Sequence, residues 1–592
     1  MPKPSEQVQT KALVHIRETF DEYKELSKGY REEFLDIYNE VSSYREEKRA
    51  DWSVTNKVNK IQTIIEKVVP RFIAKSPKFL LSKRENSFNF EDQDEELIRN
   101  SMRAMEDYLF MVFDKYNQEA QVEKCALMMA TYGTCLARVD YSYETAMIIN
   151  KKGGREEQVI AQYPMIKPVS WTNVYVDPRY NSLHEMPAIV EIEEGIRLSE
   201  LKRKEKSGEY FNISKVKDLV NGINPFNDDE DNDRESLFAQ AGVTNENKKP
   251  APDKNSINLK VYYGYFQEDE EGDEKLYKIT SVDDKVIIGY QEINSYPFVD
   301  FHAFLDPEVF YSKGFAQRLI GLQRDANFKM NSASEMINMG MNHMFFWSPM
   351  STVNPRDLVS RPGGIIAAKD TRMAMEQVQE VPFKEVPSDY FQDKNDKERD
   401  FQVLSHTVDV TNQRNAQSLT NTATGARISL FESNAVMDRI RRRFEKSLER
   451  LGYKFLETAF ENIEDNMIIK KQGDEGFWGI NKEAFRDALN RYDIKVEANS
   501  SSFDDVEGRR EEAIGLFNTA LQAVGAGVPI DLQSMFIKVL DTFEIKDPEN
   551  FMQAGGEMAG PMGAGGQLPA PEPEADTAEE QTQAIVGGQQ PF

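Results

Sequence analysis

The sequence predicts an α+β fold in which helices predominate. Long segments with apolar residues at helical spacing occur near both ends of the chain and in its middle, where Phe315, Leu319 and Leu322 are an example. Short β-like runs interrupt these segments in residues 134–194 and 257–293. Hydrophobic residues make up 40% of the 592 residues, which is enough for a substantial core. We therefore expect roughly three to four ordinary domains or one large composite body.

The charge balance is acidic, with 100 Asp and Glu against 73 Lys and Arg and a net charge of -27. A broad basic surface that coats nucleic acid is excluded by this balance, although brief local contacts with DNA are not. Cys125 and Cys135 are the only cysteines, and no histidine accompanies them at a ligand spacing. Structural zinc needs about four ligands, so we expect no metal and two buried thiols in a reducing compartment.

The first residues, MPKPSEQVQT, lack the apolar region of a signal peptide. No stretch reaches the ~18 apolar residues of a membrane span. The nearest candidate, residues 336–350, is interrupted by Asn338, Asn342 and His343. We expect a soluble intracellular product without a membrane span.

The composition of residues 223–257 predicts a mobile acidic loop followed by a polar linker. Asp229, Asp231 and Asp233 resemble the start of a calcium loop. The EF-hand pattern requires Gly where Arg234 stands and an acidic residue where Gln240 stands. The pattern therefore favours a solvated loop over a calcium site.

The sequence contains no motif that indicates catalysis. A phosphate-binding GxxxxGK[ST] loop, a GxSxG turn and an HExxH pair are all absent, and the five histidines are scattered. We expect no enzyme activity and no cofactor.

One basic segment, DRIRRRFEKSLERLGYK, opposes the overall charge. The side chains of Arg439, Arg443, Lys446 and Arg450 share one helix face by their spacing. This face is either solvated and paired with acids of its own helix, or it meets an acidic neighbour or a DNA backbone. The acids concerned are Asp438, Glu445 and Glu449.

A polar stretch, NQRNAQSLTNTATGARI, separates two helical segments at residues 412–428. A plain connection between helices needs only about 2–8 residues. The length and the Asn, Thr, Ser and Gln content therefore require another explanation.

In this order of parts the chain resembles the portal proteins of tailed bacteriophages, the head-to-tail connectors. GFAQRLIGLQRDANFKMNSASEMINM resembles the first stem helix of that family, SPMSTVNPRDLVSRPGGIIAAKD its clip, and NDKERDFQVLSHTVDVT its returning stem helix. TATGARISLFESNAVMDRIRRRFEKSLERLGYKF is similar to the long helix that follows the tunnel loop, and WTNVYVDP to a strand end in the wing.

The resemblance implies a portal fold with wing, stem, clip and crown regions that assembles into a ring. The regions it implies are an N-terminal helical arm (1–50), the wing (51–309), the first stem helix (310–343), the clip (344–388) with a short strand at residues 365–368, the second stem helix (389–410), the tunnel loop (411–424), the long wing helix with a β/α segment (425–502), a helical crown (503–546) and a disordered tail (547–592).

The function that the resemblance implies is a DNA channel at one capsid vertex of the virion. The genome is packaged through it by a separate terminase, retained and ejected, and tail adaptor proteins dock on it. The expected partners are copies of the chain in a ring, commonly of twelve subunits, double-stranded DNA bound transiently and without sequence preference, the terminase, the major capsid protein, tail adaptors and a scaffold protein. The chain would be made in the host bacterial cytoplasm.

The resemblance also implies functional positions. The residues expected to line the DNA channel are Arg414, Asn415, Gln417, Ser418, Asn421, Thr422, Thr424 and Arg427. The basic helix face is expected at a subunit interface, and the clip and adaptor contacts at Asn354, Arg356, Arg361, Gly363 and Gly364. The alternatives are another multimeric virion adaptor or scaffold-like protein, or an acidic intracellular hydrolase.

Overall fold

The structure is a computed structural model with two compact units, residues 1–506 and 507–592, which are described separately. It combines helices and strands, with helix predominant, and the expected α+β class is confirmed. The residues that the structure describes are 3–42, 53–73, 77–84, 95–149, 155–222, 256–268, 272–282, 284–342, 344–358, 365–382, 386–406, 423–462, 467–470, 476–480, 482–496, 506–525, 535, 536 and 539.

The chain starts with a long helix, α1 (Glu6–Val41), which is capped by the side chain of Ser5. A second helix, α2 (Lys60–Val68), follows and passes into one 3-10 turn, η1 (Val69–Arg71). Pro70 lies in that turn. It ends the α-helix as the sequence predicts, because proline cannot donate the next backbone hydrogen bond.

A five-stranded antiparallel sheet lies between α1 and two short helices, α5 (Leu198–Lys206) and α6 (Ile213–Gly222). Successive strand residues point to opposite faces. Val190 and Tyr262 therefore pack with α1, whereas their neighbours pack on the side of α5 and α6. The strands in spatial order are β4 (Val174–Val176), β5 (Ala188–Arg197), β6 (Ser256–Phe266), β7 (Lys275–Val282) and β8 (Val286–Glu292).

A second sheet connects this layer to the main helical core. It has the order β3 (Arg155–Val169), β2 (Thr134–Ile149) and β9 (Phe298–His302). Two helices, α3 (Glu95–Lys115) and α4 (Gln118–Tyr132), precede it and pack in the same core. The buried thiols of Cys125 and Cys135 lie there, as expected.

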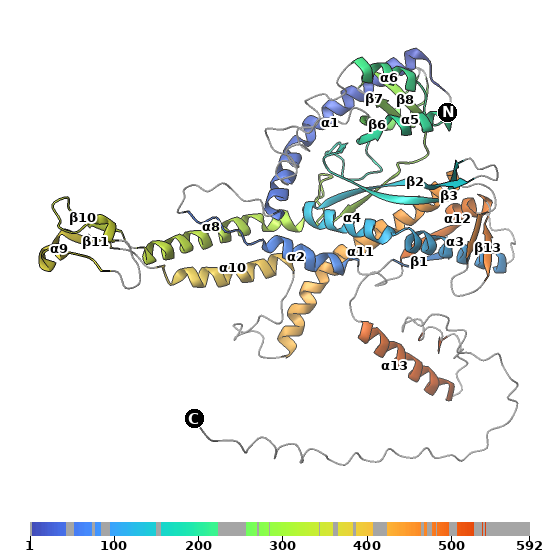
Figure 1. Cartoon of the computed structure of the whole chain (residues 1–592). Helices are drawn as coiled ribbons and strands as arrows, with labels where there is room; N and C mark the ends of the chain where they lie inside the picture. Colours follow the sequence, from blue (N-terminus) through green and yellow to red (C-terminus); the bar gives the residue numbers. More distant parts are fainter. Residues whose placement is uncertain are drawn as a thin grey trace. The chain divides into compact units, whose positions relative to one another are not determined.

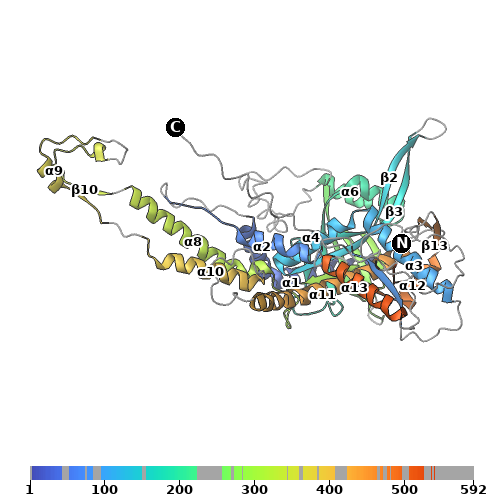
Figure 2. The same ribbon diagram turned by 90° about the horizontal axis from the view of Figure 1, so that it is seen from below.

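The helix α8 (Phe315–Met341) leaves this body beside the antiparallel α10 (Asp389–Ser405), and both views show them side by side (Figures 1 and 2). The two helices bracket a small subregion. Its elements are β10 (Phe345–Trp347), η2 (Pro355–Leu358), α9 (Thr371–Gln377) and β11 (Val378–Glu380), and β10 pairs with β11.

Two expectations for this region are wrong. The first stem helix begins at Phe315 rather than Phe310, because Phe310 is buried in the sheet core and Lys313 bridges Phe304 before the chain turns into the helix. Residues 365–368 form no strand. The strand pair of this subregion uses Phe345–Trp347 and Val378–Glu380 instead, so local β propensity at residues 365–368 has no partner strand to satisfy it.

The longest helix, α11 (Ala423–Asn462), returns through the body and carries the buried residues Phe444, Leu448 and Leu451. The hairpin of β12 (Met467–Lys470) and β13 (Phe477–Ile480) follows, and then α12 (Lys482–Arg491). The strand β14 (Tyr492–Val496) then pairs with β1 (Phe79–Lys83), which lies far from it in the sequence. The helix α13 (Val506–Gly525) belongs to the second unit.

Candidate functional site

The paired helices α8 and α10 are joined by a crossed set of ion pairs. Lys329 on α8 binds Asp393 on α10 at 2.9 Å, and Lys397 on α10 binds Asp325 on α8. Lys329 and Asp325 also pair within α8 at 3.4 Å. Each lysine thus lies between two carboxylates, and such a network fixes the register of one helix against the other better than an isolated pair does.

The β10–β11 subregion exposes an unusual amount of apolar surface. The exposed fractions are 63% for Phe346, 88% for Met350 and 83% for Ile365. Patches of this kind on a protein surface mark sites of interaction. Trp347 holds the segment together by donating from Nε1 to the carbonyl of Val353 at 2.9 Å.

The residues expected to contact an adaptor are described only in part. Asn354 accepts the backbone N–H of Arg356 at 3.1 Å through its side chain and thereby starts the turn η2. The Asn354 position is explained by this local turn. Arg361, Gly363 and Gly364 lie outside the described residues.

The predicted tunnel loop lies mostly outside the described residues, as Arg414, Asn415, Gln417, Ser418, Asn421 and Thr422 do. The helix α10, which precedes the predicted loop, ends at Ser405 and thus before the expected residue 410. His406 caps it in the left-handed conformation. On the other side α11 begins at Ala423, so Thr424 and Arg427 lie in its first two turns. The structure describes only their backbone.

The four residues of the expected basic face of α11 fall into two groups. Two of them contact the body: Arg450 binds the buried carboxylate of Asp300 at 2.7 Å, and Arg443 donates to the carbonyl of Ala303 at 3.1 Å. Arg439 and Lys446 are exposed.

The acids expected to pair with that face have other partners among the described residues. Asp438 and Glu445 lie beside Arg441, at 3.1 and 3.8 Å, and the Glu449 carboxylate accepts the backbone N–H of Val496. These contacts give Asp438, Glu445 and Glu449 partners outside the basic face, and the pairing of that face with acids of its own helix stays a prediction.

A chain of hydrogen bonds that the sequence did not suggest connects β9 to the start of α8. His302 contacts Asp300 through Nε2 and Ser312 through Nδ1, each at 2.9 Å. The order Asp, His, Ser resembles a hydrolase triad. All three residues are buried, and the carboxylate of Asp300 also pairs with Arg450, so no substrate surface adjoins the serine. The arrangement positions the stem helix rather than a nucleophile.

Asp300 is the central charged residue of this chain of hydrogen bonds. Burial alone would raise its pKa, but the hydrogen bond from His302 and the charge of Arg450 outweigh burial and lower the pKa to about 2. The carboxylate is therefore ionised and joins β9, α11 and, through His302 and Ser312, the entry to α8. A single sequence gives no signal for this contact, because its members are separated by up to 150 positions.

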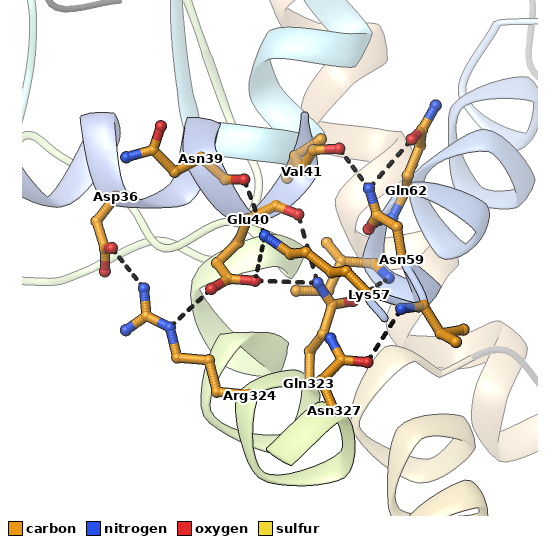
Figure 3. Close-up of polar contacts among 12 residues, drawn as sticks. Asp36, Asn39, Glu40, Val41, Lys57, Asn59, Gln62, Gln323, Arg324 and Asn327 are labelled. Atoms are coloured by element: carbon orange, nitrogen blue, oxygen red, sulfur yellow. Dashed lines mark hydrogen bonds and ion pairs between the residues drawn. The ribbon is translucent and has the colours of Figure 1, made fainter. Parts of the chain in front are cut away.

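The helix α8 is also joined to the C-terminal end of α1 (Figure 3). Arg324 on α8 contacts Asp36 and Glu40 at the end of α1, and Lys57 binds Glu40 at 3.1 Å. Burial acts to raise the pKa of Glu40, but the hydrogen bonds from Arg324 and Lys57 outweigh it and the pKa is lowered. Glu40 is therefore a charged anchor between α1, α8 and the segment before α2.

That segment, residues 53–58, lies along α8 and is called the strap below. Alternate backbone N–H groups of the strap donate to α8 side chains four positions apart. Four helical residues advance about 6 Å, and two residues of extended chain advance about 6.6 Å, so the two spacings match. The contacts are Val54 to Glu335 (3.0 Å), Asn56 to Asn331 (3.0 Å) and Val58 to Asn327 (3.1 Å), with Ile61 of α2 bound to Gln323 (2.9 Å).

The described part of the chain shows neither a group of metal-ligating residues nor a membrane-spanning helix. Among those residues no group of three or more His, Cys, Asp or Glu is arranged to hold a metal ion. None of the described helices is long and apolar enough to cross a bilayer.

In the described part of the chain, a mixed α/β body carries two paired helices with an exposed apolar strand pair at their end. The family described as "Phage SU10 portal protein" matches residues 82–590. The chain therefore belongs to this family of phage portal proteins, which are generally structural rather than catalytic. No curated protein matches the chain. The arm, the strap and α2 precede the matched residues.

Proposed function

We propose that this chain forms the ring-shaped DNA channel at one vertex of a phage capsid. A separate terminase drives the genome through the ring, and the ring then retains the genome and later ejects it. The match of the portal family to residues 82–590 carries this proposal. The paired helices α8 and α10 support it, since they have the order and the antiparallel arrangement expected of a stem.

In this proposal the regions named from the resemblance keep their roles. Residues 51–309 and 425–502 form the wing, α8 and α10 the stem, residues 344–388 the clip and residues 503–546 the crown. Copies of the chain, commonly twelve, pack side by side in the ring. The apolar side chains of Phe346, Met350 and Ile365 are then covered by a neighbouring clip or by a tail adaptor, because exposed groups of this size favour burial.

Residues 411–424 would form the narrowest part of the channel. Asn, Gln, Ser and Thr side chains contact phosphates without retaining them for long, and a net charge of -27 avoids a continuous basic wall. Arg414 and Arg427 would each repeat around the ring and centre the duplex. The major capsid protein surrounds the ring, and a scaffold protein assists its incorporation during synthesis in the host cell.

The assembly is tested by its mass and shape. The purified chain should form a particle of about twelve times 68.0 kDa, with a central hole in negative-stain images. A monomer under the same conditions would overturn the proposal. A short adaptor protein is already disfavoured by the length of the chain, and a hydrolase would yield no ring.

The channel is tested in phage particles. Replacing Arg414 and Arg427 by Glu should shorten the packaged genome or reduce its retention, because like charges repel the duplex. Arg17→Glu is the matched control, since Arg17 is exposed on α1 and the change in net charge per residue is the same. Unchanged packaging and retention in the double variant would count against a channel role for this loop.

A further inference from the structure

A cluster of cations surrounds Phe304 where α10 ends. Arg318 of α8 places its guanidinium 4.3 Å from the centre of the Phe304 ring, and the ring of His406 is 6.4 Å from the same centre. Arg443 of α11 donates to the adjacent carbonyl of Ala303 at 3.1 Å. Arg318 and Arg443 thus bring positive charge from α8 and α11 to one place, beside the imidazole of His406 at the end of α10.

Arg439 completes the cluster. It lies one helical turn before Arg443, and like charges at this spacing repel each other. Burial and the charge of Arg439 both lower the pKa of Arg443. Burial lowers the pKa of His406, and Arg318 and Arg439 lower it further. The charge interactions that lower these pKa values are therefore repulsive, whereas Arg318 and Arg443 make favourable contacts with the Phe304 ring and the Ala303 carbonyl.

Carboxylate partners are missing here, in contrast to other half-buried cations of this acidic chain. Arg324, Lys397 and Arg450 each contact at least one Asp or Glu. Among the described residues no carboxylate forms an ion pair with Arg318, Arg439 or Arg443. Cations that repel one another and form no ion pair with a carboxylate among the described residues have the properties of an anion site.

We propose that Arg318, Arg439 and Arg443 form a binding site for a phosphate oxyanion at the root of residues 407–422. Guanidinium groups bind phosphate through paired N–H donors, and the Phe304 ring holds Arg318 by its face. The anion would be a phosphodiester of duplex DNA or a free phosphate. Binding of a DNA phosphodiester rests on the proposed DNA channel, whereas binding of free phosphate does not.

The experiment uses the assembled full-length chain and two probes. Binding of a fluorescein-labelled duplex is followed by anisotropy over a range of salt concentrations, and the effect of inorganic phosphate on the melting temperature is compared with chloride at equal ionic strength. The variants are Arg439→Gln, which is exposed and should fold, and Arg439→Gln with Arg443→Gln. Arg442→Gln is the matched control, because Arg442 is an exposed neighbour on α11 outside the cluster.

The double variant should bind the duplex about tenfold or more weakly, with a shallower dependence of log Kd on log salt, and Arg442→Gln should not. A loss of duplex binding identifies the phosphodiester as the source. If only the rise in melting temperature with phosphate is lost, the site takes free phosphate.

Two results would overturn the site. One is a double variant that keeps both the duplex affinity and the phosphate effect of the natural chain. The other is dissociation of the particle by Arg439→Gln, which would identify the cluster as a contact between copies. Failure of the natural chain to form a ring would refute the channel instead, and the phosphate measurement would still decide the site.

Discussion

Arg450 and Asp300 form an ion pair of 2.7 Å, with the carboxylate buried and the arginine partly exposed, and this pair connects α11 to β9, the strand that precedes α8. His302 binds the second oxygen of the same carboxylate and continues the contact to Ser312, three residues before α8 begins. The start of α8 is thus connected to the body through one ionised side chain, in addition to the contacts of Arg324 with α1.

Asp300→Asn should therefore destabilise the protein in a pH-dependent way. The pKa of Asp300 is about 2 in the folded chain and 3.8 ordinarily, so its contribution is complete above pH ~4 and is lost as pH falls toward 2. The shift corresponds to roughly 2 kcal/mol. Urea unfolding of both proteins at several pH values should show a difference that shrinks with acidification. A difference that is independent of pH would contradict this account.

Gly133→Ala should destabilise the joint between α4 and α8. The residue has φ +90°, and an added Cβ would collide with the backbone carbonyl of Ser312. Both effects act in the folded state, so we expect a loss of more than about 2 kcal/mol in thermal unfolding. Gly321→Ala is the control: it lies within α8, its Cβ meets nothing within 4 Å, and it should stabilise by about 0.5–1 kcal/mol. Equal effects of the two substitutions would refute the close approach.

The position of the strap along α8 should depend on its hydrogen bonds to acceptor side chains of α8. Asn331→Leu removes the acceptor for the N–H of Asn56, whereas Asn331→Asp keeps an oxygen in the same place. Hydrogen exchange of the Asn56 amide should be about fivefold to tenfold faster in the leucine variant only, in line with the roughly 1 kcal/mol of one hydrogen bond. If both variants exchange like the natural chain, the strap does not lie on α8 in solution.

Arg138→Met should cost about 3–5 kcal/mol, the range for breaking a buried ion pair. Arg138 is 2% exposed and contacts Asp140, Glu191 and Glu193 within 2.6 Å. Burial raises the pKa of Glu191 to about 6, despite the attraction of Arg138. Without the arginine these carboxyl groups should favour the protonated form further. The loss should therefore be larger at pH 8 than at pH 5.

A second substitution tests the charge explanation for Arg138. Adding Glu191→Gln to Arg138→Met removes one of the uncompensated carboxylates and should recover part of the stability at pH 8. Chemical unfolding of the single and double variants provides the comparison. No recovery in the double variant would indicate that lost packing, and not charge, dominates.

The sequence by itself determined the class of elements and most of their positions. Periodic apolar residues predicted the β-like runs that form β6, β7 and β8 and the long helix around Phe444, because burial of one face imposes a repeat that is visible locally. The order of these segments was also sufficient for the family. The tunnel-loop residues, by contrast, remain a prediction from that order.

Tertiary structure decided where the stem begins and what holds it. Phe310 continues a helical pattern in the sequence, but a sheet core buries it and Gly314 becomes the N-cap. Asp300 meets Arg450, and Arg324 meets Glu40, across more than a hundred residues. Such contacts leave no periodic trace, because each depends on one side chain meeting another after the chain has folded. The sequence therefore determined which segments form the paired helices α8 and α10, and the packing of distant elements determined where these helices are anchored.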